Sequence, residues 1–70
     1  MKENSTINIY VANKTIFAEN LQNESIAIYN TQGQSIASAR NINGTFEAVV
    51  SQAGVYVVRA GGEVWKVVVK

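Results

Sequence analysis

Apolar and polar residues alternate with a period of two along most of this chain, and this alternation restricts the fold more than any other feature. The segments 7–11 (INIYV) and 25–30 (SIAIYN) are the clearest cases. Such a period places alternate side chains on opposite faces of a β-strand, whereas an amphipathic helix needs a period of about 3.6 residues. The chain contains no proline, and no segment keeps a helical period. The sequence therefore predicts an all-β protein.

Clusters of turn residues separate the β-rich segments and predict about seven short strands. The expected strands are rich in β-branched and aromatic residues, and they cover residues 7–11, 15–19, 25–30, 35–42, 45–50, 55–60 and 63–69. Seven strands at this spacing are typical of an antiparallel β-sandwich. We expect residues 7–70 to form this single domain, after a segment 1–6 that is disordered or was added to the natural chain.

Two-residue turns predict how the later strands pair. Asn43-Gly44 suits a type I′ hairpin, in which both central residues need a positive φ, and this hairpin would set Arg40 opposite Glu47. Its core face would collect Ala37, Ala39, Phe46, Ala48 and Val50. Earlier in the chain, residues 30–33 (NTQG) predict a longer turn with Gly33 in the left-handed conformation.

Gly61-Gly62 predicts a second hairpin, formed by the last two strands. Its register places two cross-strand pairs on the core face, Tyr56 with Val67 and Val58 with Trp65, followed by Val69. The opposite face receives Val55, Val57, Arg59, Val64, Lys66 and Val68. That face is too apolar to be fully solvated, so either a neighbouring domain covers it or its lysine protects against edge-to-edge association. The same reasoning predicts a monomer or a weak edge-mediated dimer.

Catalytic chemistry has few residues to draw on in this chain. Cysteine, histidine and aspartate are absent, which removes disulfides, thiolate metal ligands and the commonest general base. The five glutamates are spread along the chain, and the serines have only Lys14 or Lys66 as an activating partner, in a fold that rarely provides a pocket. We therefore expect no enzyme, no cofactor and no metal site. The net charge of +1 indicates neither a nucleic-acid nor an anionic-membrane partner.

Membrane and export segments are not evident in the sequence. No stretch approaches the roughly 18 apolar residues of a membrane span. The N-terminal MKENSTINIY lacks the apolar core of a signal peptide. Two explanations compete: a cytoplasmic protein, or a module of a larger secreted chain.

Sequons and aromatic residues are the candidate carbohydrate features. Four Asn-x-Ser/Thr sequons begin at Asn4, Asn13, Asn23 and Asn43, and we interpret them as turn asparagines because the chain is rich in Asn, Ser and Thr. Among the aromatic residues, only Tyr10 and Tyr29 fall on expected outward faces, where they can stack on a sugar. An immunoglobulin-like adhesion or carbohydrate-binding domain of a surface protein is therefore the alternative function.

Three segments, in order, resemble the C-terminal sorting domains of type IX secretion. IAIYNTQGQSI (residues 26–36) is similar to that family's hydrophobic-x-hydrophobic-Tyr-Asp-x-x-Gly segment, with Asn30 at the aspartate position. GVYVVRA (54–60) is similar to its Gly-x-Tyr-x-Val-Arg strand, and KVVVK (66–70) to its final Lys-hydrophobic strand. The family's Pro-Asn-Pro motif ahead of the first strand has no counterpart in this proline-free chain.

The resemblance implies both a fold and a function. Members of the family are immunoglobulin-like β-sandwiches of secreted and surface proteins of Bacteroidota, and they direct the attached protein across the outer membrane, where the cargo is anchored. We accordingly expect a non-catalytic sorting or anchoring module of a larger precursor, located at the cell surface or secreted. Its partner would be the secretion machinery or a neighbouring domain. Recognition would fall on the final strand, at Lys66, Val67, Val69 and Lys70.

Overall fold

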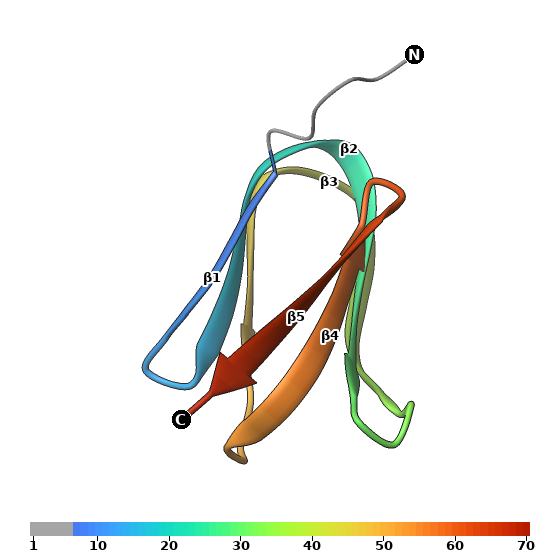
Figure 1. Ribbon diagram of the computed structural model, residues 1–70. Helices are drawn as coiled ribbons and strands as arrows, with labels where there is room; N and C mark the ends of the chain where they lie inside the picture. Colours follow the sequence, from blue (N-terminus) through green and yellow to red (C-terminus); the bar gives the residue numbers. More distant parts are fainter. Residues whose placement is uncertain (1–6) are drawn as a thin grey trace.

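The computed structural model describes residues 7–70 and consists of antiparallel strands joined by short turns (Figure 1). The strands are β1 (Asn8–Ala12), β2 (Thr15–Asn30), β3 (Ser35–Val49), β4 (Gly54–Ala60) and β5 (Glu63–Val69). The described residues contain no helix, so the all-β prediction is confirmed, and nothing in them crosses a membrane as a helix. The segment 1–6, expected to be disordered or added, lies outside the described residues.

The expected count of seven strands is wrong, because β2 and β3 each span two of the predicted strands. Positive φ angles occur inside both long strands, at Asn20, Asn23, Asn41 and Gly44. The pairing of β2 with β3 shifts register around the same positions. Asparagine and glycine tolerate the left-handed conformation, and a β-bulge bends a strand without ending it. At the positions where the sequence predicted one strand to end and the next to begin, the chain therefore bends and stays in the sheet.

The hairpin predicted at Asn43-Gly44 is also absent. Gly44 lies opposite Leu21 and Glu47 opposite Phe17, so Arg40 does not face Glu47. The Asn43 side chain instead accepts a hydrogen bond from the backbone N–H of Asn23 at 2.9 Å. Pairing with β2 satisfies the backbone of β3 on both sides of the bend, which a short local hairpin would not do. The predicted core face still holds, since Ala37, Ala39, Phe46, Ala48 and Val50 all belong to the core or pack against it.

The bend divides the sheet into two halves that share one core. The first half contains β1, residues 15–19 of β2 and residues 45–49 of β3; the second contains residues 25–30 of β2, residues 35–40 of β3, β4 and β5. In Figure 1, β2 and β3 arch together over the top of the molecule, from one half to the other. Because β1 also contacts β5, the sheet curls around the interior.

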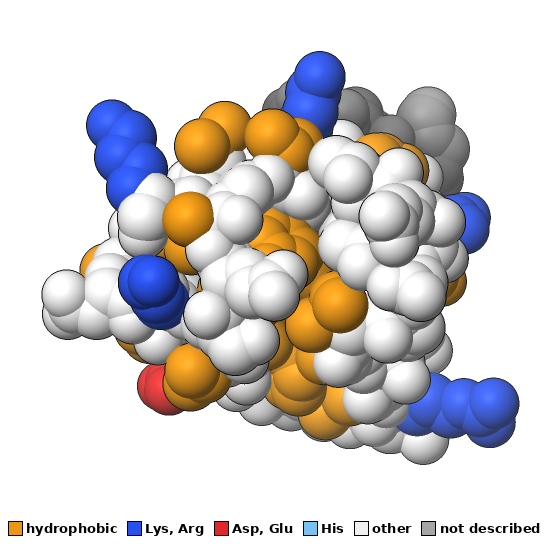
Figure 2. Space-filling model, turned by 90° about the horizontal axis from the view of Figure 1, so that it is seen from below, with side chains coloured by type: hydrophobic (Ala, Val, Ile, Leu, Met, Phe, Trp, Pro, Cys, Tyr) orange, Lys and Arg blue, Asp and Glu red, His pale blue; other side chains and the backbone are white. Residues whose placement is uncertain are grey.

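The core draws on both halves of the sheet. Its fully buried large side chains are Ile16 from the first half and Ile26, Ile28, Val58 and Val69 from the second. Seen from the end that carries the β1–β2 and β2–β3 turns, apolar side chains form a central band that reaches the surface (Figure 2). Since both halves bury their inner faces in this band, their outer faces point away from each other.

Two of the predicted turns are confirmed. Gly61 and Gly62 both have positive φ, and the β4–β5 register sets Tyr56 opposite Val67 and Val58 opposite Trp65, as expected. Gly33 has a φ of 82° in the turn between β2 and β3. A third two-residue turn, Asn13-Lys14, joins β1 to β2 with positive φ at both residues.

Candidate functional site

Strand β5 combines a buried face with an accessible one. Among the described strands it pairs with β4 alone, so it forms an edge of the sheet. Val69 is 1% exposed and Val67 is half-buried, whereas Lys66 and Lys70 are exposed. The four residues expected to carry recognition therefore separate into two that hold the strand in the core and two that another protein can reach.

The outer face of the second half carries three cations among apolar side chains. We call it the basic face, and it consists of Arg40, Arg59, Lys66, Tyr29, Val55, Val57, Val64 and Val68. Strand β2 lies in its middle, since Ala27 pairs with Ser38 of β3 on one side and with Arg59 of β4 on the other. Val57 likewise lies between Tyr29 of β2 and Lys66 of β5.

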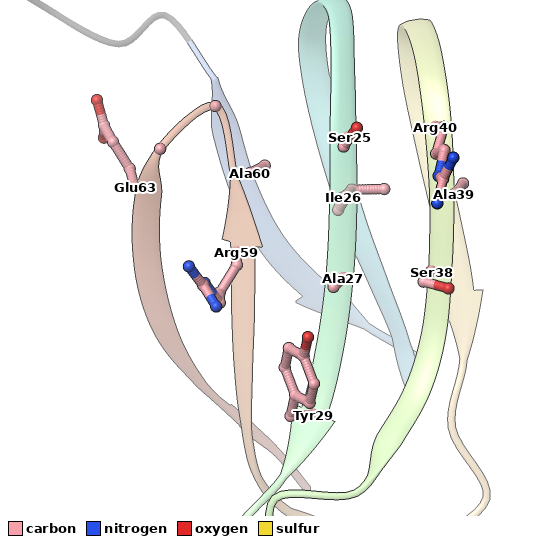
Figure 3. Close-up of a pocket in the computed structure, with 12 residues that line it drawn as sticks. Ser25, Ile26, Ala27, Tyr29, Ser38, Ala39, Arg40, Arg59, Ala60 and Glu63 are labelled. Atoms are coloured by element: carbon pink, nitrogen blue, oxygen red, sulfur yellow. The ribbon is translucent and has the colours of Figure 1, made fainter.

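A depression on the basic face brings two guanidinium groups to one surface. Arg40 of β3 and Arg59 of β4 line it, together with the hydroxyl-bearing side chains Ser25, Tyr29 and Ser38 and one acidic residue, Glu63 (Figure 3). Guanidinium and hydroxyl groups donate hydrogen bonds to carboxylates and other anions. Arginine stays protonated and therefore cannot activate a serine as a general base. The arrangement is suited to recognising a polar or anionic group.

The outer face of the first half carries an aromatic pair. Tyr10 of β1 lies opposite Phe17 of β2, and the two rings stack with centroids 4.8 Å apart and an interplanar angle of 8°. The Tyr10 hydroxyl donates a hydrogen bond to Oε2 of Glu19 at 2.9 Å. This hydrogen bond is the main cause of a raised pKa for Tyr10, to which burial and the negative charges of Glu19 and Glu47 add.

The two tyrosines expected on outward faces are not brought together. Tyr10 is 40% exposed on the first half, whereas Tyr29 is half-buried on the basic face of the second. The expectation that only these two aromatic residues face outward is wrong, because Phe17 shares the outer face with Tyr10. The sequence signal that could have predicted this pair is the two-residue turn at Asn13-Lys14, because its register sets Phe17 opposite Tyr10.

The sequon asparagines and the glutamates form no further site in the described residues. Asn13 lies in the β1–β2 turn, and Asn23 and Asn43 lie at the bend, so these three act as turn or bend residues; Asn4 is outside the described range. No group of three or more potential metal-ligating side chains occurs within residues 7–70.

Comparison with known proteins identifies no relative. The chain matches no family model, no curated protein and no solved structure.

Proposed function

We propose that this domain is a non-catalytic sorting and anchoring module of a secreted or cell-surface protein, exported by a type IX-like pathway. The observation that carries the proposal is the division of β5 into a buried and an accessible face. Val69 and the half-buried Trp65 and Val67 hold the strand against the core, while Lys66 and Lys70 are exposed. A translocon can therefore read the lysines without unfolding the domain. The resemblance of the 26–36, 54–60 and 66–70 segments to the sorting family supports the same function.

We further propose that the fold is an immunoglobulin-like sandwich made from the two halves of the bent sheet. The hydroxyl of Tyr56 supports this assignment, because it donates a hydrogen bond at 2.7 Å to the backbone carbonyl of Gln52, four residues upstream. A tyrosine near the start of a strand, bonded to the backbone just before it, is a recurrent feature of immunoglobulin-type sandwiches.

Recognition would use the edge of β5 as well as the two lysines. An edge strand presents backbone N–H and C=O groups that can pair with a strand of another protein, and side chains on that strand then select the partner. Lys66 lies on the exposed face of β5 and Lys70 directly follows the strand, so both exposed lysines are available to acidic groups of a receptor.

The experiment is export of a reporter fused to the domain in a type IX-competent host. We expect Lys66→Ala with Lys70→Ala to block export while changing the free energy of unfolding by less than about 0.5 kcal/mol, since exposed side chains contribute little to stability. The matched control is Lys14→Asn with Arg40→Ala, which removes the same charge elsewhere and should leave export intact. Asparagine is chosen at position 14 because the backbone there has a φ of 57°.

The outcomes separate recognition from edge protection. Normal export of the Lys66/Lys70 variant, beside an exported wild-type fusion, would show that the lysines only prevent edge association. A wild-type fusion that stays inside a competent host would contradict the sorting function itself.

A second candidate is an immunoglobulin-like adhesion domain that binds carbohydrate, favoured by the exposed Tyr10. Its ring lies beside Asn8 and Glu19, whose side chains supply hydrogen-bonding groups of the kind that sugar hydroxyls use. Binding on a glycan array that is lost with Tyr10→Ala would favour this candidate over sorting.

A further inference from the structure

The charged side chains on the outer faces of the sheet are sorted by sign. Glu19 and Glu47 lie on the outer face of the first half, whereas Arg40, Arg59 and Lys66 lie on that of the second. We call the former the acidic face, and it consists of Tyr10, Phe17, Glu19, Glu47 and Val49. The other charged residues of the range 7–70 lie at the turns, the bend or the chain end: Lys14, Glu24, Glu63 and Lys70.

Both faces also expose apolar surface. Val49 is 77% exposed on the acidic face, while Val64 and Val68 are 62% and 57% exposed on the basic face. Burying these valines against a second surface would remove apolar area from water, which favours association. The two faces lie on opposite sides of one core, so one molecule can present both at the same time.

The spacing of the charges on one face matches the spacing on the other. On the acidic face, Glu47 lies opposite Phe17, and Glu19 is two residues further along the same strand as Phe17. On the basic face, Lys66 lies opposite Val57, and Arg59 is two residues further along from Val57. In each pair, the two charged residues are therefore diagonal neighbours on adjacent antiparallel strands. Such neighbours lie about 7–8 Å apart.

We propose that the basic face of one copy of this domain packs against the acidic face of a second copy. Arg59 and Lys66 of one copy then meet Glu19 and Glu47 of the next, and the valines of both faces are buried between them. Packed sheets lie about 10 Å apart, a distance that long cationic side chains span. Because two different faces meet, each copy keeps one free face and the assembly is open-ended. The proposal does not depend on the sorting function.

The size of the faces predicts weak association. Four strands at about 4.8 Å spacing and seven residues at about 3.3 Å give a basic face of roughly 20 by 23 Å. That area, on the order of 450 Å², is about half of what each partner contributes to a stable complex. Stacking should therefore appear at high protein concentration, or between copies held together by another means.

Sedimentation velocity across a concentration series tests the proposal. In low salt we expect the weight-average mass to rise with concentration and to pass the mass of a dimer. Salt of roughly 1 M, where the Debye length is about 3 Å, should reduce the association. Glu19→Lys with Glu47→Lys gives both faces cations, and Arg59→Glu with Lys66→Glu gives both faces a pair of carboxylates, with Arg40 as the one cation left on the second face. Each variant alone should stay monomeric, and an equimolar mixture should associate again.

A matched variant separates face complementarity from net charge. Glu24→Lys with Glu63→Lys raises the net charge as much as the Glu19/Glu47 reversal but keeps Glu19, Glu47, Arg59 and Lys66, so it should associate like the wild type. Far-UV circular dichroism checks that each variant is folded, and the salt dependence of the wild type tests the proposal without any variant. A wild-type chain that stays monomeric throughout, stops at a dimer, or associates equally after reversal of Glu19 and Glu47 would overturn it. The last result would instead indicate pairing through the edge of β5.

Discussion

Asn30 holds the turn between β2 and β3 through its side-chain amide. Its Oδ1 accepts hydrogen bonds from the backbone N–H groups of Gln32 and Gln34, both at 2.9 Å, and its Nδ2 donates one to Oε1 of Gln34 at 2.9 Å. Asparagine and aspartate both supply such an oxygen to a turn. The amide oxygen of Asn30 therefore makes the backbone contacts that shape this turn.

Tyr10 should titrate above its usual pKa of about 10, because its hydroxyl donates to Glu19 and because the carboxylates of Glu19 and Glu47 oppose a phenolate. The unfolded chain loses this proton at about pH 10 and the folded chain only at higher pH. The contribution to stability is thus complete below pH 10 and falls as the pH rises above it. An absorbance titration of the tyrosines checks the expectation.

Two variants test the cause of this raised pKa. Glu19→Gln keeps a hydrogen-bond acceptor but removes the charge, so it should lower the pKa of Tyr10. Glu63→Gln removes a carboxylate that does not act on Tyr10 and should leave the titration unchanged. Identical titration curves for the wild type and Glu19→Gln would show that Glu19 does not raise the pKa of Tyr10.

At the scale of the element, β5 offers two neighbouring valines in opposite environments. Val69 is 1% exposed and Val68 is 57% exposed. We expect Val69→Ala to lower the free energy of unfolding by about 1–3 kcal/mol, because it removes buried methyl groups. Val68→Ala should change it by less than about 0.5 kcal/mol. Urea denaturation measures both, and equal losses would mean that the two faces of β5 are not divided as described.

At the scale of the whole molecule, the two halves should unfold together because they share one core. Ile16 belongs to the first half and is 1% exposed, whereas Trp65 lies in the second half, partly buried against the same core. Replacing a buried isoleucine with alanine costs about 2–5 kcal/mol. We therefore expect Ile16→Ala to lower the midpoint of Trp65 fluorescence and of far-UV circular dichroism by the same amount.

The exposed Val49 provides the control for that experiment. It lies in the first half at 77% exposure, so Val49→Ala should leave both midpoints nearly unchanged. A Trp65 midpoint that stays constant in Ile16→Ala, while the circular dichroism midpoint falls, would mean that the two halves unfold separately.

Features that depend on near neighbours in the chain could be predicted from the sequence alone. The period-two pattern established strands, and Gly61-Gly62 established the register of β4 and β5, because a two-residue turn leaves its flanking strands one way to pair. Counting alternate residues from that turn then predicted that Val67 and Val69 face the core, whereas Lys66 and Lys70 face away from it. These outcomes need only local geometry.

The tertiary structure decided everything that depends on partners far apart in the sequence. Asn43-Gly44 has the residues of a hairpin, yet β3 runs through it because β2 offers backbone partners along almost the whole of β3. The resulting bend places β2 between β3 and β4, which brings Arg40 and Arg59 to one depression and sends Glu19 and Glu47 to the opposite side. Local propensity and alternation carry no information about which strands become neighbours, since that choice follows from burying both halves of the sheet in a single core.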